Sequence, residues 1–357
     1  MRVEHDTKLD FDDVLIRPKR STLSSRKDVN LERTFKFIHS GRTWTGIPII
    51  ASNMDSTGTF EMAETLSKYE IITALHKFYS IDELKQFLPI LNKPDYIAYT
   101  LGIKDEDFGK LKEVLNENLG EYFNFIVLDV PNAYLQRYVE KLKELRNLCP
   151  KHTIIAGNVV TNEMTEELIL SGADIVKIGI GSGSACTTRR MTGVGYPQLS
   201  AVIECSDAAH GITNSNPGCG LIISDGGAVY PCDIAKAFCA GADFVMLGSL
   251  FSGYDQSNGE IIEKNGRKYK QFYGMSSSKA QEKYYGKVFE YRASEGRVLE
   301  VPYKGDVNIF IQELFGSLRS TATYIGARKL KEFSRRATLI RVNNQLNKSL
   351  EKYDNIS

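Results

Sequence analysis

Short apolar runs, many of them rich in β-branched residues, recur along the chain and are separated by stretches of helical length. The eight runs are residues 47–50, 71–74, 96–100, 125–130, 153–156, 175–178, 221–224 and 244–247. Near-continuous apolar strands are typical of a parallel sheet that is buried on both faces. Eight strand–helix units at this spacing predict an α/β fold, a closed (β/α)8 barrel of the TIM type.

Two long insertions interrupt the regular spacing. A loop rich in Gly and Ser, residues 179–189, follows the sixth run, and residues 252–311 separate the eighth run from a last helix. Long irregular insertions in a compact fold are usually binding loops or lids. Both would emerge at the C-terminal face of the barrel, where active sites are built. The chain thus predicts an active-site loop and a lid on that face.

These features predict one domain over residues 1–357. Within it we expect an N-terminal arm at 1–45, a barrel core at 46–251, a lid insertion at 252–311, and a last helix with a C-terminal tail at 312–357. The lysine-rich tail after Lys329 is expected to form a surface helix. The phrase Gly-Ala-Asp occurs at 172–174 and again at 241–243, each time just before a strand, which indicates one strand–helix design used twice.

Composition narrows the class of protein. Hydrophobic residues make up 42% of the chain and charged residues 25%, as in an ordinary globular protein. The net charge of +1 argues against a broad nucleic-acid or membrane-binding surface. No apolar run approaches the length of a membrane span, and residues 1–6 lack the apolar core of a secretory signal. We therefore expect no nucleic-acid partner and no membrane.

The number and spacing of the cysteines and histidines indicate the cellular compartment and whether a zinc site is expected. Six cysteines in a chain of this length do not form a dense disulfide framework, and neither Cys-x-x-Cys nor His-Glu-x-x-His occurs. The chain is therefore expected to be a reduced, cytoplasmic protein, and a zinc site of thiolates and imidazoles is not expected.

Cys186 is the strongest candidate for covalent chemistry. A lone cysteine is more often a small buried hydrophobe. This one lies in the loop after a barrel strand, beside Thr187, Thr188 and Arg189, where a cation and backbone N–H groups favour the thiolate. The glycines at 179, 181 and 183 do not complete a dinucleotide fingerprint. They indicate instead a loop whose backbone approaches an ion or ligand closely.

Two glycine-containing loops indicate an anion site. Asp225-Gly226-Gly227 follows the seventh run and Gly248-Ser249 follows the eighth, the two positions from which barrels often build a phosphate site. Turns that need positive φ explain single glycines equally well. Asp225 would repel phosphate, so a ribose hydroxyl is its natural partner.

Arg292 and Glu295 lie together in the late insertion. They are either a solvated charge pair or, if the lid folds over the barrel mouth, Glu295 is a proton-transfer group.

At this point the chain resembles the IMP dehydrogenase and GMP reductase family over nearly its whole length. The phrases that carry the resemblance are Asp-Asp-Val-Leu-Ile-Arg-Pro at 12–18, Ala-Gly-Asn-Val at 156–159, the cysteine loop at 181–189, Gly-Val-Gly-Tyr-Pro-Gln at 193–198, Tyr-Gly-Met-Ser-Ser at 273–277 and Tyr-Arg-Ala-Ser-Glu-Gly at 291–296. The Gly-Tyr-Pro-Gln and Tyr-Arg-Ala-Ser-Glu-Gly phrases resemble the reductase branch, and no additional regulatory segment interrupts the barrel.

The resemblance implies the reductive deamination of GMP by NADPH, which gives IMP, NADP⁺ and ammonia and serves purine nucleotide salvage. It implies that Cys186 forms a covalent thioimidate with purine C2, and that Thr188 and Glu295 share a proton relay. It also implies K⁺ at the carbonyls of Gly181, Gly183 and Cys186 near Arg189, and a homotetramer.

The same resemblance implies two sets of binding residues. The nucleotide site comprises Ser184, Asp225, Gly226, Gly227, Gly248, Ser249, Gly274, Met275, Ser276, Arg292, Ala293, Ser294, Glu295 and Gly296. The NADPH site comprises Lys77, Asp129, Val130, Pro131, Ile180, Gly181, Met275, Tyr291, Arg292, Ser320, Thr321, Ala322 and Thr323, with Ser25 and Arg26 from a neighbouring subunit.

The chain departs from the family pattern at four positions. Ser182 stands where proline is usual, and this exchange is expected to loosen the cysteine loop and weaken the ion site. Pro131 replaces alanine, Ala133 replaces glycine, and Ser249 replaces the second glycine of a pair. Two alternatives stay open: an IMP dehydrogenase, and a catalytically silent purine-nucleotide sensor that keeps the barrel and its binding loops.

Overall fold

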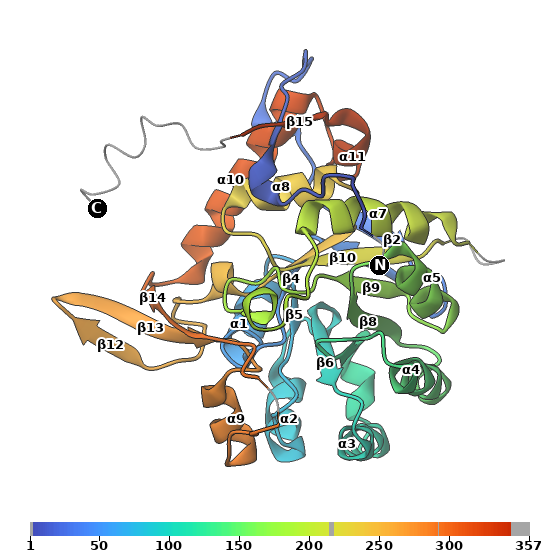
Figure 1. Ribbon diagram of the computed structural model, residues 1–357, viewed down its shortest axis with the longest axis vertical. Coiled ribbons are helices and arrows are strands. Elements are labelled where there is room, and N and C mark those ends of the chain that lie inside the picture. The colour runs from blue at the N-terminus through green and yellow to red at the C-terminus, as the bar shows by residue number, and fades with distance from the viewer. Residues whose placement is uncertain (1–2, 214–217, 292, 344–357) are drawn as a thin grey trace.

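Eight parallel strands close into a barrel, which confirms the fold predicted from the apolar runs (Figure 1). The computed structural model describes residues 3–213, 218–291 and 293–343. The barrel strands are β4 (Ile49–Ala51), β5 (Ile72–Ala74), β6 (Ile97–Leu101), β7 (Phe125–Asp129), β8 (Thr153–Val159), β9 (Ile175–Ile178), β10 (Leu221–Asp225) and β11 (Phe244–Leu247). They pair in chain order, and β11 pairs with β4 to close the ring.

Helices follow the strands and cover the outside of the barrel (Figure 1). They are α1 (Phe60–Ser67), α2 (Ile81–Phe87), α3 (Asp105–Asn116), α4 (Gln136–Leu148), α5 (Asn162–Leu170), α7 (Gln198–Gly211), α8 (Pro231–Cys239) and α10 (Val307–Ile325). A short helix, α6 (Thr188–Thr192), lies in the long loop after β9. The last long helix begins at Val307, earlier than the expected 312, because Asp306 caps it by accepting a hydrogen bond from the backbone of Asn308.

A β-hairpin from the N-terminal segment plugs the bottom of the barrel. It consists of β2 (Arg33–Lys36) and β3 (Thr43–Gly46). Phe35 stacks on Phe244 with ring centroids 4.6 Å apart, and Trp44 meets Phe125 edge to face at 6.0 Å. These rings share one buried cluster with the inward side chains of the barrel strands. The end of the barrel opposite the long insertions is therefore filled.

The repeated Gly-Ala-Asp phrase has a structural role at this lower end. Asp174 accepts a hydrogen bond from the backbone of Ile154, and Asp243 accepts one from the backbone of Ile222. Each carboxylate thus ties the start of its own strand to the neighbouring strand, and each is itself buried. The repetition seen in the sequence reflects the same contact made twice.

Asp243 also binds a histidine, which makes stability depend on pH. Its Oδ2 lies 2.8 Å from Nε2 of His210, and this hydrogen bond raises the pKa of His210 above its usual range. A raised folded-state pKa contributes stability that is fully present below about pH 6.5 and is lost as pH rises through the folded-state value. The His210→Ala variant should therefore lose more unfolding free energy at about pH 5.5 than at about pH 9. Urea unfolding at both pH values measures this difference, with His5→Ala, an exposed site, as the control.

Two smaller sheets complete the structure. β12 (Ile261–Lys264), β13 (Arg267–Tyr273) and β14 (Val298–Pro302) form an antiparallel sheet that projects beside α9 (Ser278–Tyr285), as Figure 1 shows. β1 (Val14–Ile16) pairs with β15 (Leu339–Arg341).

Residues 330–343 do not form the expected surface helix. They form the 3-10 turn Leu330–Glu332, the four-residue α11 (Phe333–Arg336) and β15, and Phe333 is fully buried against the body of the protein. The rest of the predicted helix, residues 344–357, lies outside the described residues. Within the described part of the chain, no helix is both long and apolar enough to span a membrane.

Candidate active site

The cysteine loop joins β9 to α6 at the mouth of the barrel. Within it, the Sγ atom of Cys186 lies 3.1 Å from the hydroxyl oxygen of Thr188, the first residue of α6. That hydroxyl lies 2.7 Å from Oε2 of Glu295 and donates to it. A hydroxyl has one proton to donate, so its oxygen accepts from the Cys186 thiol. The three predicted catalytic side chains therefore form one continuous hydrogen-bonded chain.

Glu295 follows Thr188 by 107 positions in the sequence, and backbone hydrogen bonds hold their two segments together. The Thr187 amide donates to the Glu295 carbonyl at 2.9 Å, and the Arg297 amide donates to the Ala185 carbonyl at 3.0 Å. Cys186 and Gly296 form an isolated antiparallel bridge between these two contacts. The predicted lid segment thus lies directly along the cysteine loop, and the Glu295 side chain binds Thr188. The charge pair that the sequence also allowed involves Arg292, which lies outside the described residues.

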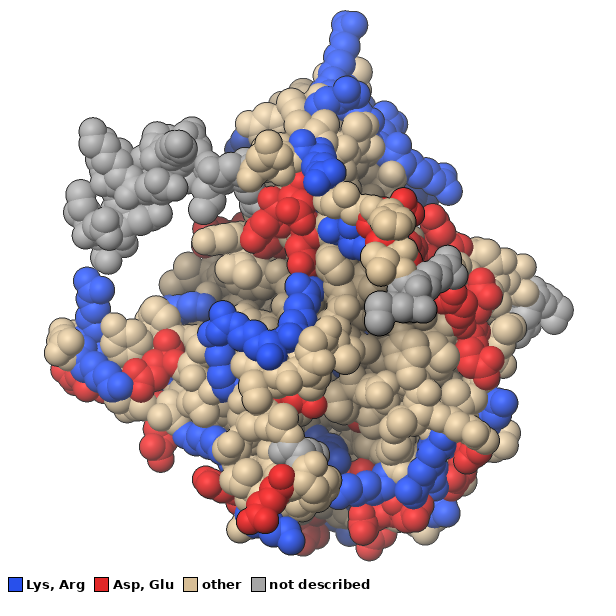
Figure 2. All heavy atoms as spheres, viewed as in Figure 1, with Lys and Arg blue, Asp and Glu red and all other residues tan. Residues whose placement is uncertain are grey.

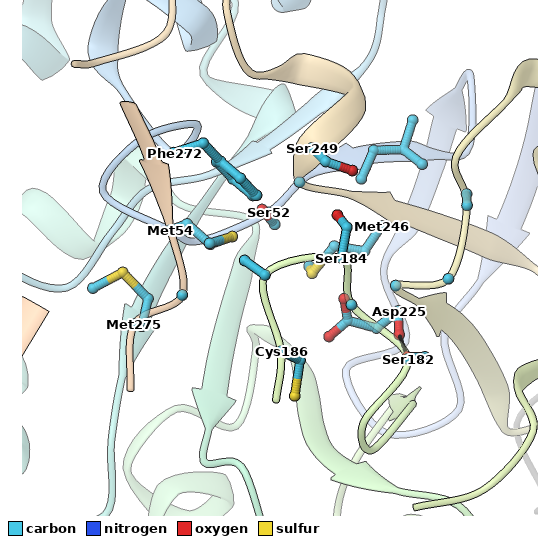
Figure 3. Close-up of a pocket in the computed structure, with 18 of the residues that line it drawn as sticks. Ser52, Met54, Ser182, Ser184, Cys186, Asp225, Met246, Ser249, Phe272 and Met275 are labelled. Atoms are coloured by element: carbon cyan, nitrogen blue, oxygen red, sulfur yellow. Dashed lines mark hydrogen bonds between the residues drawn. The ribbon is translucent and has the colours of Figure 1, made fainter. Parts of the chain in front are cut away.

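A cavity of about 220 Å³ opens beside Cys186. Figure 3 shows Met54, Phe272 and Met275 on one side of it and Ser182, Ser184 and Asp225 on the other. The predicted nucleotide-binding residues that line it are Ser184, Asp225, Gly226, Gly227, Gly248, Ser249, Gly274, Met275, Ser276 and Glu295.

Three described residues that were predicted to bind the nucleotide are not part of this lining. Ala293, Ser294 and Gly296 are absent from the wall, although Gly296 makes the bridge to Cys186. Arg292 lies outside the described residues.

The two glycine-containing loops meet at one corner of the cavity, as their positions after adjacent strands predict. Gly226 and Gly227 both have φ +83°, a conformation that favours glycine. A Cβ atom on Gly226 would also lie only 2.9 Å from the Ser182 hydroxyl. The backbone at this corner is therefore open to close approach by a ligand.

A second cavity shares a wall with the first. Cys186, Asp225 and Met275 line both. The predicted cofactor-binding residues in the second cavity are Asp129, Val130, Pro131, Ile180, Gly181 and Met275. Oδ1 of Asn158, another wall residue, is buried without a hydrogen-bond partner. A bound ligand that donates a hydrogen bond would satisfy this atom.

The other described residues that were predicted to bind the cofactor lie outside this second cavity, and Arg292 lies outside the described residues. The ammonium of Lys77 pairs with Asp107 at 3.1 Å, and Tyr291 is 81% exposed. Ser25 caps the short 3-10 helix Arg26–Asp28, which packs against α10 of the same chain. That helix, α10, carries the others, which are Ser320, Thr321, Ala322 and Thr323. The segment with Ser25 and Arg26 therefore packs on α10 of its own chain, and the predicted residues there lie outside the second cavity.

Ser182 makes a contact that proline in its place could not make. Its hydroxyl donates to the Asp225 carbonyl at 3.0 Å and so ties the cysteine loop to the end of β10. The expectation of a looser loop and a weaker ion site stays a prediction.

Two contacts describe the predicted potassium ligands: Gly183 binds Cys186, and Gly181 lies against the side chain of Arg189. The Gly183 carbonyl accepts the Cys186 amide at 2.9 Å, and a Cβ atom on Gly181 would lie 2.7 Å from Cγ of Arg189. The Arg189 guanidinium itself binds Asp10 at 2.9 Å and the Tyr196 carbonyl. Among residues 3–213, 218–291 and 293–343, no group of three or more His, Cys, Asp or Glu side chains could hold a metal ion.

Sequence reasoning did not select three polar residues of the second cavity, Lys177, Asn53 and Asn158, which contact the predicted residues Asp129 and Asp225. Lys177 of β9 is 2% exposed, and its ammonium lies 2.7 Å from Asp129 and 3.0 Å from Asp225. Asn53 donates to Asp129, and Asn158 donates to Asp225. The sequence did contain a signal for Lys177, because a charge within a buried apolar strand needs a partner of opposite charge.

The face around the barrel mouth carries charges of both signs. Figure 2 shows a group of Lys and Arg side chains near its centre, with acidic side chains around it. Positive charge at the entrance of a cleft attracts anionic ligands.

Comparison with known proteins identifies the family. Residues 8–349 match the family model described as "IMP dehydrogenase / GMP reductase domain". The chain is 56% identical to a GMP reductase of Caenorhabditis elegans over 348 residues, which cover 97% of this chain and 95% of that protein. It is 56% identical to human GMP reductase 2, with 97% of each chain covered, and 57% identical to human GMP reductase 1, with 97% and 98% covered. The chain therefore belongs to the IMP dehydrogenase/GMP reductase family.

Proposed function

We propose that this protein is a GMP reductase that uses NADPH to convert GMP to IMP and releases ammonia. The single observation that carries the proposal is the hydrogen-bonded chain from Cys186 through Thr188 to Glu295, at 3.1 and 2.7 Å. Relatives of this chain named GMP reductase, similar along almost their full length, support the choice of this reaction.

Cys186 acts as the nucleophile in this proposal. Its proton passes to Thr188 while the Thr188 proton passes to Glu295, so that a thiolate and a carboxylic acid arise together. The thiolate adds to purine C2 of GMP. The C2–N bond then breaks and leaves a covalent thioimidate.

The departing nitrogen needs a proton, because amide ion is too basic to leave. Glu295, now protonated, returns its proton through Thr188 to the 2-amino group, and ammonia departs. The C–S bond breaks when IMP is released, and the sulfur returns as the free thiol. The overall balance is GMP, NADPH and one proton to IMP, NADP⁺ and ammonia.

The residues of the second cavity fit NADPH. Asp129, Val130, Pro131, Ile180, Gly181 and Met275 would hold it, and the unpartnered buried Oδ1 of Asn158 supports a ligand with a hydrogen-bond donor there. When bound, NADPH supplies the hydride that replaces the amino group at C2. Cys186 belongs to the walls of both cavities, so a nucleotide on its sulfur would face the cofactor side.

The same proposal includes K⁺ and a homotetramer. Carbonyl oxygens of Gly181, Gly183 and Cys186 are ligands that suit a hard cation, and K⁺ there would hold the cysteine loop. Ser25 and Arg26 would complete the NADPH site of a neighbouring subunit. We also assign the protein to the cytoplasm, since its described cysteines are all free thiols.

An assay of the purified protein with GMP and NADPH tests the proposal. Loss of NADPH absorbance with release of one ammonia per NADPH is expected. Turnover only with IMP and NAD⁺ would instead assign the dehydrogenase reaction. GMP binding without any turnover would assign a nucleotide sensor.

A further inference from the structure

A buried lysine connects the two cavities at the mouth of the barrel. Lys177 is the third residue of β9, and its side chain crosses β8 at Gly157, where a Cβ atom would lie 2.6 Å from Cβ of the lysine. Its ammonium contacts Oδ1 of Asp129 at 2.7 Å and Oδ2 of Asp225 at 3.0 Å. The lysine thus spans from β7 to β10 through a gap that a glycine leaves.

The two carboxylates border different ligands in the proposed function. Asp225 lines both cavities, whereas Asp129 lines only the second, proposed cofactor cavity. Both hydrogen bonds to Asp225, from Lys177 and from Asn158, fall on Oδ2. Oδ1 of Asp225 is therefore left to accept a hydroxyl of the bound nucleotide.

The positive charge of Lys177 stabilises the negative charges of both Asp129 and Asp225. Burial disfavours a charged ammonium, but the carboxylates of Asp129 and Asp225 outweigh this effect and raise the pKa of Lys177. Without the ammonium, two carboxylates near each other in a buried setting would repel and shift their positions or charges. A change in the charge or position of Asp129 then alters Asp225, although the two acids bind different ligands in the proposed function.

We propose that Lys177 is a positioning residue that sets the orientation of Asp225 for the nucleotide and of Asp129 for the cofactor together, and so couples the two sites. The proposal rests on the proposed function, because it assumes that Asp225 binds the nucleotide. Lys177 itself borders the second cavity but not the first, so its effect on the nucleotide site acts through Asp225.

The test measures GMP binding by calorimetry on the full chain, without NADPH. In Lys177→Met, a side chain of similar length without the charge, the Kd for GMP should rise about tenfold or more. Adding Asp129→Asn should recover about threefold or more of that loss, although Asp129 does not line the nucleotide cavity, because the repulsion on Asp225 is removed. Lys177→Arg, which keeps the charge, should stay closer to the wild type than Lys177→Met.

Several results would overturn the inference. A lower melting temperature with an unchanged GMP Kd in Lys177→Met would assign the lysine a purely structural role. A double variant no better than Lys177→Met would show that the two acids are not coupled. If Lys177→Met does not fold, Lys177→Gln takes its place in the same comparison, with the same expected and contradicting results. A wild-type protein that binds no GMP would overturn the proposed function first.

Discussion

A Cys186→Ala variant is expected to bind GMP with nearly unchanged affinity and to turn it over at least about 10⁴-fold more slowly. The reason is that alanine has no group to bond to purine C2, so ammonia has to leave in a single unassisted displacement. The cavity wall changes by only one atom, because Cys186 contributes only part of a lining formed by many residues. Stopped-flow measurement of NADPH oxidation gives the rate, and calorimetry gives the affinity.

Cys219→Ala is the matched control for this experiment. Cys219 is also a half-buried free thiol, but it pairs with Phe37 at the bottom of the barrel, and its variant should turn over normally. Mass spectrometry of acid-quenched turnover mixtures should find a purine nucleotide bonded to Cys186 in the wild type. Product formation by the Cys186→Ala variant at a rate near that of the wild type would rule out the covalent route.

Loss of the acid at the far end of the relay should have the second-largest effect. Glu295→Gln keeps the shape of the side chain and its contact with Thr188, but it has no proton to return to the departing amine. We expect kcat with GMP to fall about 10²- to 10³-fold. The KM for GMP should change much less, because the backbone pairing that holds the lid segment to the cysteine loop remains.

Three further variants separate proton transfer from lid structure. Glu300→Gln makes the same chemical change on β14, where Glu300 pairs with the exposed Lys264, and it should be silent. Thr188→Val should mimic Glu295→Gln, whereas Thr188→Ser, which keeps the hydroxyl, should retain most activity. Equal losses in Glu295→Gln and Glu300→Gln would show that the relay has no special part in the reaction.

The barrel could be predicted from the sequence because each strand carries its own signal. Residues 175–178 and 244–247 are short apolar runs between helical stretches, and the structure has β9 and β11 at those bounds. The plug hairpin could not be predicted, because Phe35 and Trp44 are fixed by contact with Phe125 and Phe244, which lie far away in the chain. Contacts of this kind leave no local periodicity.

The site was predictable in part for a similar reason. The resemblance to a known family points to Cys186, Thr188 and Glu295 as residue types in matching phrases, and the structure brings these three side chains together. Lys177 was not predicted as a site residue, because the run at 175–178 was interpreted only as a buried strand. Its single charge needed two acids from other strands, and only the folded barrel shows which acids they are.

The plug hairpin determines at which end of the barrel ligands can enter and leave. Since Phe35 and Trp44 fill the lower end of the barrel, nothing passes along its axis. In the proposed reaction, GMP, ammonia and the oxidised cofactor would therefore all enter or leave at the upper rim. Ammonia, which forms before the hydride transfer, would leave while the nucleotide and the cofactor are still bound.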